Sequence, residues 1–205
     1  MKISIIDYGL GNLRSVYGAI ERIGGEVSIT NDISELKQSD KLILPGVGAF
    51  ADGMESLKKL GLIEPLKELI IEQKKPIFAI CLGFQLLAKE SSEFGAHKGL
   101  GFIDAIVRKI NRNDKQIIIP HVGWNDMIKV QDSYLWKEIP KDTLFYYVHS
   151  YHVVCNNKRI IIGKCHYGID FISAIEDKNI VATQFHPEKS QYFGLQVLKN
   201  FIEKK

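Results

Sequence analysis

The first half of the chain repeats one local pattern: a short apolar strand, a turn and an amphipathic helix. The pattern predicts strands at Lys2–Asp7, Glu26–Thr30, Lys41–Leu44 and Pro76–Ile80. It predicts helices at Asn12–Ile23, Ala49–Leu60, Ile63–Gln73 and Leu82–Lys89. Such alternation makes successive strands parallel and covers both faces of their sheet with helices. We therefore expect an α/β fold with a mainly parallel central sheet.

The second half has a different pattern, in which short strands follow one another with turns between them. These strands are predicted at Phe102–Ile110, Gln116–Pro120, Thr143–Val148, Ile160–Cys165, Phe171–Glu176 and Ile180–Gln184. An amphipathic helix at Ser190–Ile202 follows the last of them. A length of 205 residues suits one domain better than two. We expect residues 1–205 to form a single domain, with extra antiparallel strands contributed by the second half.

The composition excludes several classes of protein. With 45% hydrophobic and 25% charged residues, it is ordinary for a soluble globular protein. The net charge of +3 gives no reason to expect a nucleic-acid partner, and the apolar runs are too short to span a membrane. Three cysteines without regular spacing predict no disulfide framework, so we expect a cytoplasmic location. The spacings typical of metal sites are missing, and we expect neither a metal nor a cofactor.

Cys81 stands where the predicted strand Pro76–Ile80 turns into the next helix. Ala79 and Gly83 lie two residues on either side, and small residues are needed there because a sharp strand-to-helix turn brings two backbones together. This pattern is that of a nucleophile elbow, with cysteine in place of serine. The N-terminus of a helix lowers the pKa of a thiol, so Cys81 is a candidate nucleophile.

A second candidate group follows the last predicted strand. His186 and Glu188 stand two residues apart, and Pro187 restricts the backbone between them. A thiol nucleophile needs a base that takes its proton and later protonates the leaving group, and that base needs an orienting carboxylate. Because the carboxyl ends of parallel strands meet at one edge of the sheet, we expect His186 and Glu188 to lie beside Cys81.

The third predicted strand ends in a glycine-rich turn, Gly46-Val47-Gly48. Turns of this kind leave backbone N–H groups free to bind negative charge. The segment lacks the Gly-Lys-Ser/Thr of a phosphate loop, so we interpret Gly46 and Val47 as one half of an oxyanion hole. The backbone N–H of Leu82, directly after the candidate nucleophile, would form the other half.

Each feature also has an interpretation without catalysis. A cysteine at a strand end is often a buried structural residue. A histidine and a glutamate around a proline are often parts of an ordinary turn. The meeting of these segments in one crevice is what favours a catalytic site over these alternatives.

Together, these segments resemble the class I, or triad, glutamine amidotransferases. Further segments narrow the resemblance to the branch that supplies ammonia to a cyclase subunit in histidine biosynthesis. They are Asp7–Val16, Pro120–Asn125, Tyr147–Tyr151 and Gln184–Ser190, the last of which reads QFHPEKS. The resemblance covers nearly the whole chain, from residue 3 to residue 202. It implies a flavodoxin-like fold of the class I glutamine amidotransferase type.

The resemblance implies a role for each candidate residue. Cys81 would attack the side-chain amide of glutamine, His186 would pass the proton to the departing ammonia, and Glu188 would orient His186. Backbone N–H groups of Leu82 and of Gly46 or Val47 would hold the oxyanion. The implied glutamine-binding positions are Gly48, Gln85, His149, Ser150 and Tyr151.

The resemblance also implies a partner, a (β/α)8-barrel cyclase subunit that forms a heterodimer with the chain. This cyclase would use the ammonia to make imidazole glycerol phosphate and aminoimidazole carboxamide ribotide. The implied interface positions are Asn12, Trp124, Tyr146 and Lys189. Simpler interpretations exist for all of them: a helix cap for Asn12, core aromatic residues for Trp124 and Tyr146, and a solvated charge for Lys189.

Three other functions stay open at this point. The segment Glu90–Gly101, with Ser150-Tyr151-His152, resembles a branch that supplies ammonia for amidino-sugar synthesis in surface-polysaccharide pathways. A non-catalytic scaffold subunit would keep the fold and the partner surface, although intact Cys81 and His186 argue against it. A cysteine hydrolase or peptidase is a third possibility, but QFHPEKS and Gln85 favour glutamine.

Gly46 indicates how activity would depend on the partner. A glycine lacks Cβ, so its peptide can rotate at little cost. We expect the oxyanion donor to be turned away in the resting subunit and to swing in when the cyclase binds its ligand. A lost donor of this kind slows catalysis by about 10²–10³.

Overall fold

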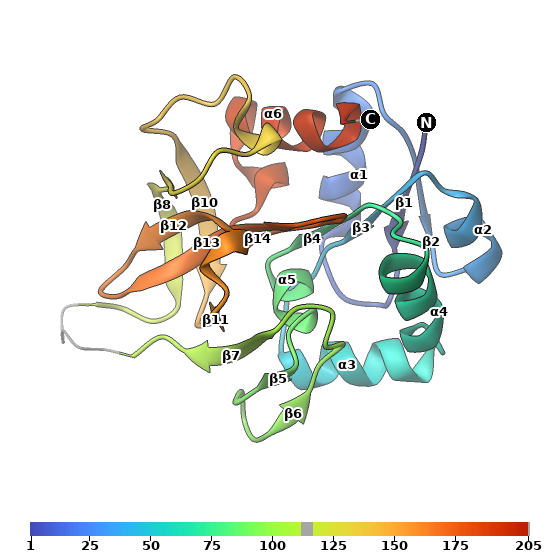
Figure 1. Ribbon diagram of the computed structural model, residues 1–205, viewed down its shortest axis with the longest axis horizontal. Helices are drawn as coiled ribbons and strands as arrows, with labels where there is room; N and C mark the ends of the chain where they lie inside the picture. The colour runs from blue at the N-terminus through green and yellow to red at the C-terminus, as the bar shows by residue number, and fades with distance from the viewer. Residues whose placement is uncertain (112–116, 205) are drawn as a thin grey trace.

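In the computed structural model, which describes residues 1–111 and 117–204, the chain folds around a mixed eight-stranded β-sheet (Figure 1). Its strands in spatial order are β2 (Glu26–Thr30), β1 (Lys2–Ile6), β3 (Lys41–Leu44), β4 (Ile77–Ile80), β14 (Ile180–Thr183), β13 (Asp170–Asp177), β12 (Ile161–His166) and β9 (Ile128–Lys129). The first five run parallel to one another, and the last three pair antiparallel. The predicted α/β fold with a mainly parallel sheet is confirmed.

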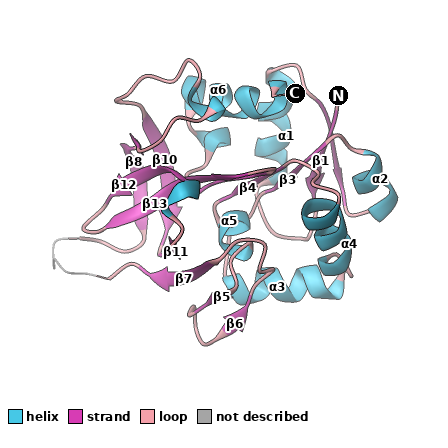
Figure 2. Ribbon diagram, in the orientation of Figure 1, coloured by secondary structure: helices cyan, strands magenta, loops and turns pink. Residues whose placement is uncertain are grey.

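Helices cover both faces of the sheet (Figure 2). One face carries α1 (Leu13–Arg22) and α6 (Gln191–Glu203), and the other carries α3 (Phe50–Lys59), α4 (Ile63–Lys67), the π-helical turn η1 (Glu68–Glu72) and α5 (Leu82–Leu86). A short helix, α2 (Ile33–Gln38), connects β2 to β3. The first helix begins where its sequence predicts, because the Asn12 side chain accepts a hydrogen bond from the Ser15 N–H and caps it.

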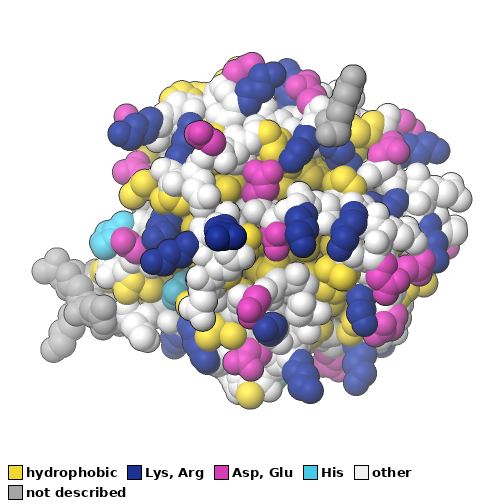
Figure 3. All heavy atoms as spheres, viewed as in Figure 1, with side chains coloured by type: hydrophobic (Ala, Val, Ile, Leu, Met, Phe, Trp, Pro, Cys, Tyr) yellow, Lys and Arg dark blue, Asp and Glu magenta, His cyan; other side chains and the backbone are white. Residues whose placement is uncertain are grey.

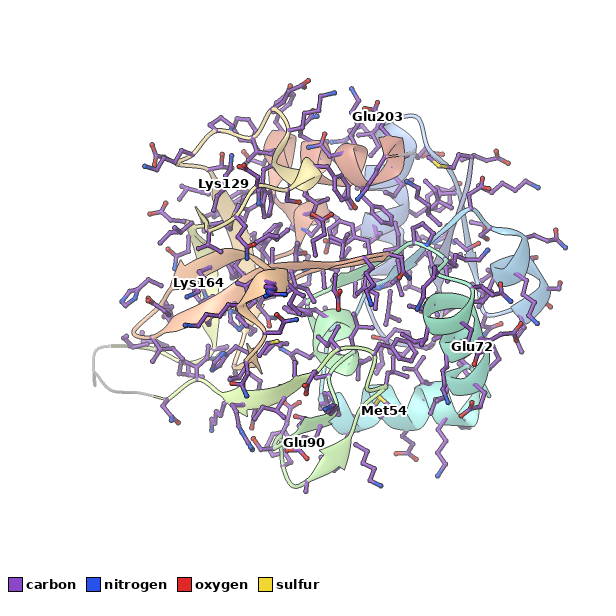
Figure 4. The ribbon with its side chains drawn as sticks, viewed as in Figure 1. Met54, Glu72, Glu90, Lys129, Lys164 and Glu203 are labelled. Atoms are coloured by element: carbon purple, nitrogen blue, oxygen red, sulfur yellow. The ribbon has the colours of Figure 1, made fainter. Side chains whose placement is uncertain are left out.

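The central strands are apolar because they are covered on both sides. Every residue of β3, β4 and β14 is buried, as is usual for parallel strands between two helical layers. Met54 of α3 packs against the buried hydrophobic core that includes Phe50 and Leu57 of the same helix (Figure 4). Lys41 is the charged member of β3, and its ammonium donates to the carbonyl oxygens of Phe201, Ile202 and Lys204 at 2.7, 2.9 and 2.5 Å. A cation placed there complements the C-terminal end of α6.

The second half adds two smaller sheets beside the parallel strands. β8 (His121–Asp126) pairs antiparallel with β10 (Leu144–His149), and Trp124 lies opposite Tyr146 in the register. The other small sheet has the order β11 (Tyr151–Cys155), β7 (Ala105–Lys109), β5 (Glu90–Ser91) and β6 (His97–Lys98). Three 3-10 turns, η2 (Tyr134–Trp136), η3 (Lys158–Ile160) and η4 (Pro187–Lys189), complete the described part of this half.

Several predictions for local structure were wrong. The strand predicted at Gln116–Pro120 does not form over residues 117–120, its described part. Pro120 has no N–H for a β-ladder, Ile118 is 72% exposed, and the strand begins instead at His121. The helix predicted at Leu82–Lys89 ends at Leu86, and β7 is shorter than predicted. Sequence analysis missed α2, β5, β6, β8, β9 and β11.

The surface carries charges of both signs. On the face drawn in Figure 3, lysine and arginine side chains are interspersed with aspartate and glutamate. Across the described residues, none of the helices is both long enough and apolar enough to cross a membrane. Cys81, Cys155 and Cys165 are free thiols.

Candidate active site

Cys81 lies at a sharp turn between β4 and α5. Its backbone has φ 54° and ψ −107°, a conformation that a non-glycine residue adopts only under constraint. The constraint comes from both sides: the Cys81 N–H donates to the Thr183 carbonyl at 2.8 Å, and a Cβ at position 83 would collide with the Leu44 carbonyl oxygen. Gly83 is therefore required for the turn. The geometry is that of a nucleophile elbow, with the thiol at the N-terminus of α5.

His186 and Glu188 form a buried pair directly after β14. His186 Nδ1 lies 2.8 Å from Glu188 Oε1, and both side chains are 2% exposed. Burial alone would lower the pKa of His186, but Cys81 and Glu188 outweigh it and raise that pKa to about 10. His186 Nε2 has no hydrogen-bond partner among the described residues, so it is available to exchange a proton with the thiol or a leaving group.

A pocket opens next to the Cys81 thiol. Its volume of about 380 Å³ is within the range of small-molecule binding sites. All five predicted glutamine-binding residues line it: Gly48, Gln85, His149, Ser150 and Tyr151. Cys81, Leu82 and Val47 also line it, so the structure brings the predicted nucleophile and two predicted oxyanion positions to the same pocket. Segments far apart in the sequence thus converge at the carboxyl ends of β3, β4 and β14.

The predicted oxyanion hole is not assembled in this arrangement. The Leu82 N–H donates to the Gly46 carbonyl oxygen at 3.3 Å, so a carbonyl occupies the donor that an oxyanion would need. The Tyr8 hydroxyl donates to the Pro45 carbonyl at 2.8 Å and so helps to hold the Pro45–Gly46 segment in this position. A Cβ at Gly46 would lie 2.8 Å from Leu82 Cβ and 2.9 Å from Gly83 N, so only glycine fits.

Comparison with known proteins decides the family. Residues 4–205 match the family described as Glutamine amidotransferase class-I. This chain belongs to the class I glutamine amidotransferases. The fold, the elbow and the pocket of the amidotransferase agree with the resemblance seen in its sequence.

Curated relatives of this amidotransferase span its whole length. "Imidazole glycerol phosphate synthase subunit HisH 1" of Campylobacter jejuni is 46% identical over 98% of this chain and 98% of the Campylobacter protein. The subunit named HisH from Aquifex aeolicus is 44% identical over 100% of this chain and 97% of its own length.

Solved structures share the amidotransferase fold at much lower identity. One described as a glutamine amidotransferase superposes with a TM-score of 0.76 at 18% identity, covering 98% of this chain and 97% of that one. The structure of PurLQS from Thermotoga maritima has a TM-score of 0.75 at 17% identity, covering 98% and 97%. These two structures support the fold alone.

Sequence analysis assigned no role to three residues that line the amidotransferase pocket or contact its candidate catalytic residues. Glu93 lines it with a buried carboxylate, whose Oε2 accepts a hydrogen bond from the Phe50 N–H at 2.7 Å. Gln184 is fully buried, and its Nε2 lies 3.6 Å from Cys81 Sγ. The Ser190 hydroxyl donates to the His186 carbonyl at 2.6 Å. Gln184 and Ser190 were visible as the ends of QFHPEKS, whereas no local signal marked Glu93 as a pocket residue.

Three of the four predicted interface residues lie close together. The Trp124 and Tyr146 rings are 6.1 Å apart on the ribbon β8–β10, and the Lys189 ammonium lies 5.8 Å from the Tyr146 ring centre. Trp124 is 44% exposed, and Val122 and Leu144 beside it are also exposed. Asn12 is exposed, and its side chain caps α1 by accepting a hydrogen bond from the Ser15 N–H.

Proposed function

We propose that this chain is the glutaminase subunit of an imidazole glycerol phosphate synthase, acting in histidine biosynthesis. The observation that carries the proposal is the position of Cys81: it lies on a constrained elbow, at a pocket, and close enough to the buried His186–Glu188 pair to raise the pKa of His186. Relatives that bear the synthase-subunit name align with the chain from end to end.

The triad geometry supports hydrolysis through a thioester. Cys81 attacks the side-chain carbonyl carbon of glutamine as a thiolate, its proton having passed to His186 Nε2. His186 then protonates the amide nitrogen of glutamine as the carbon–nitrogen bond breaks. Ammonia departs, and the glutamyl group remains bound to Cys81 as a thioester. A water molecule, deprotonated by His186, attacks the thioester and releases glutamate and the free thiol. Glu188 stabilises the imidazolium in both half-reactions.

Glu93 and Gly48, which also line the pocket, would recognise the amino-acid end of glutamine. Glu93 places a buried negative charge in a pocket of about 380 Å³, and the substrate ammonium would neutralise it. Gly48 has φ +110°, a conformation that favours glycine, and it leaves the pocket wall without a side chain there.

The closed oxyanion hole would make the isolated subunit slow. As long as the Gly46 carbonyl accepts from the Leu82 N–H, the tetrahedral intermediate lacks that donor. Rotation of the Gly46–Val47 peptide would remove the carbonyl and offer an N–H in its place. We place the trigger for this rotation in the cyclase and its bound ligand.

We assign the partner surface to the ribbon β8–β10. Val122, Trp124, Leu144 and Tyr146 present one largely apolar face, and Lys189 adjoins both this face and the pocket. A (β/α)8-barrel cyclase docked there would receive ammonia close to where it is released. The free thiols support a reducing, cytoplasmic compartment for this heterodimer.

The decisive experiment measures glutamate release from glutamine by the chain alone, with its cognate cyclase, and with the cyclase plus its ribotide ligand. Cys81→Ser is the negative control, and Cys155→Ser, which alters a thiol outside the pocket, is the matched positive control. Strong stimulation by cyclase plus ligand, dependent on Cys81, is expected. Turnover without stimulation would indicate the surface-polysaccharide role, and no turnover in any mixture would indicate a scaffold subunit.

A further inference from the structure

A continuous series of hydrogen bonds begins on the ribbon β8–β10 and leads toward the pocket. Asn125 Nδ2 lies 3.3 Å from His121 Nε2, and His121 Nδ1 lies 3.1 Å from His149 Nε2. His149 Nδ1 lies 2.9 Å from the carbonyl oxygen of Tyr151. Neither His121 nor Asn125 has a part in the chemical steps proposed above.

The series continues to the nucleophile on the other side of the Tyr151 carbonyl. Gln85 Nε2 donates to this oxygen at 2.9 Å and also to Gln184 Oε1 at 3.1 Å. Gln184 Nε2 in turn donates to Cys81 Sγ at 3.6 Å. The network therefore joins strand β8 to the sulfur.

The direction of the bonds follows from the carbonyl oxygen of Tyr151, which can only accept. His149 must therefore carry a proton on Nδ1, and a neutral imidazole with that proton has a bare Nε2. Because this bare nitrogen faces His121 Nδ1, His121 must donate through Nδ1 and keep its own Nε2 as an acceptor.

The other end of the series leads to the same assignment independently. Asn125 Nδ2 donates to the carbonyl oxygen of His166 at 3.0 Å, and Asn125 Oδ1 accepts from the Asp126 N–H at 2.8 Å. The amide orientation of Asn125 is therefore fixed, and its nitrogen is the atom that faces His121 Nε2. Both ends require the Nδ1–H tautomer on both histidines.

The two rings are buried and held in place. His121 is 2% exposed and stacks on Tyr147 and Tyr167, with ring centres 4.9 and 3.9 Å away. His149 meets Phe171 at 4.8 Å. Burial lowers the pKa of His121 to about 4 and that of His149 to about 3, so both rings are neutral at neutral pH.

The same reasoning fixes two amides in the active site. Both N–H groups of Gln85 are used by Tyr151 and Gln184, so Gln85 has only its oxygen left for a substrate. Since the oxygen of Gln184 accepts from Gln85, the nitrogen of Gln184 must face Cys81. The Gln184 N–H is therefore the group that donates to the Cys81 sulfur.

We infer that His121 and Asn125 are positioning residues of the glutaminase reaction. They hold His149 in the Nδ1–H tautomer, so that the Tyr151 carbonyl orients Gln85 and, through it, the N–H that Gln184 directs at Cys81. The kinetic test of this inference rests on the proposed function, because it needs glutaminase activity. The spectroscopic test rests on the hydrogen-bond network alone.

The spectroscopic test is long-range ¹H–¹⁵N correlation NMR on protein labelled with ¹⁵N-histidine, with rings assigned through single histidine substitutions. Between about pH 6 and 8, His121 and His149 should both show a protonated Nδ1 and a bare Nε2. A protonated Nε2 on either ring, or a charged ring in this range, would overturn the inference.

The kinetic test uses glutamine turnover by the complex with cyclase and ligand. His121→Phe keeps a ring between the two tyrosines but removes the donor, and kcat/KM should fall about tenfold, with kcat lowered and KM raised. His121→Asn keeps an amide N–H near the place of Nδ1, and kcat/KM should return to within about threefold of wild type. Asn125→Ala, a change at a half-buried residue, should lower kcat/KM about threefold and serves where His121→Phe does not fold.

Two kinetic results would contradict the inference: wild-type kcat and KM in folded His121→Phe, or equal impairment in His121→Asn and His121→Phe. Thermal melting of each variant separates loss of activity from loss of fold. If the wild-type complex releases no glutamate, the proposed function fails, and the NMR experiment still decides the tautomers.

Discussion

The two halves of the active site differ in how completely they are built. On one side, the proposed triad is in place: Cys81 is held on its elbow, and the His186–Glu188 pair is buried with a 2.8 Å hydrogen bond. On the other side, the Leu82 N–H donates to the Gly46 carbonyl, so the proposed oxyanion hole is closed. Proton transfer is thus preorganised while charge stabilisation is not. On the proposed function, such a subunit would be controlled through the group that stabilises the intermediate rather than through the nucleophile.

The largest expected effect tests the side that is already built. Cys81→Ser replaces the thiolate by a hydroxyl that ionises far less readily, and we expect glutamate release to fall by more than about 10⁴-fold with and without the partner. Binding to the cyclase, measured by calorimetry, should be unchanged. Cys155→Ser is the matched control. If Cys81→Ser kept more than one hundredth of wild-type turnover, or if both variants were equally affected, Cys81 would not be the nucleophile.

Glu188→Gln tests whether the carboxylate is part of the same assembly. The amide cannot stabilise the imidazolium of His186 and removes the acceptor 2.8 Å from Nδ1, so kcat should fall about 10³-fold while KM stays within a few-fold. Steady-state kinetics of the activated complex checks this. Glu203→Gln, on the exposed end of α6, is the matched control and should leave kcat unchanged. Equal kcat in wild type and Glu188→Gln would remove Glu188 from the triad.

Tyr8→Phe tests the closed side. It deletes the hydroxyl that donates to the Pro45 carbonyl at 2.8 Å and so removes one bond that holds the closed arrangement. One such bond corresponds to about a three- to tenfold change in an equilibrium. Glutaminase activity of the isolated chain should rise by about this factor, and the ratio of stimulated to basal activity should fall. Tyr192→Phe, an exposed tyrosine, provides the control. A lower basal activity in Tyr8→Phe would mean that Tyr8 supports the open arrangement instead.

The smallest effect concerns stability against pH. The pKa of His186 is raised to about 10 in the folded protein, from an ordinary value of 6.5. A raised pKa means that the folded state binds more protons, so this contribution is fully present below about pH 6.5 and is lost as the pH rises toward 10. The free energy of unfolding, from urea titrations at several pH values, should therefore decline across this range. In Glu188→Gln the free energy of unfolding should decline less steeply with pH, and the difference in slope should correspond to less than about one bound proton per molecule. Parallel curves for the two proteins would contradict a role of Glu188 in raising the pKa of His186.

Sequence patterns located the parallel half of the fold well. In that half, one local rule decides the structure: strands covered on both faces must be apolar throughout, and helices must be amphipathic. The same rule failed at the run of isoleucines before Pro120, since Ile118 is 72% exposed. It also missed β8, which reads HVGWND and is a strand because it pairs with β10 rather than because of its own composition.

The candidate site divides in the same way. Cys81, His186 and Glu188 could be placed together because their spacing and their positions after strands carry chemical meaning. The roles of Glu93, Gln184 and Tyr8 could not be predicted, although Gln184 and Tyr8 lie in recognised motifs, because what they do depends on contacts between distant segments. Tyr8 precedes Pro45 by 37 residues, and the role of its hydroxyl becomes recognisable only when the fold brings the Pro45 carbonyl within hydrogen-bond distance. The direction of the bonds through His121 likewise needs the carbonyls of Tyr151 and His166, which no sequence pattern locates.

The Leu82–Gly46 hydrogen bond also bears on gene dosage. On the proposed function, a copy of this chain that finds no cyclase would keep the Leu82 N–H engaged and would consume glutamine slowly. Surplus copies would then place little drain on glutamine, and the expression of the two subunits would not need to be matched. The abundance of the cyclase and of its ligand would then set the flow of nitrogen, however much of this chain the cell makes.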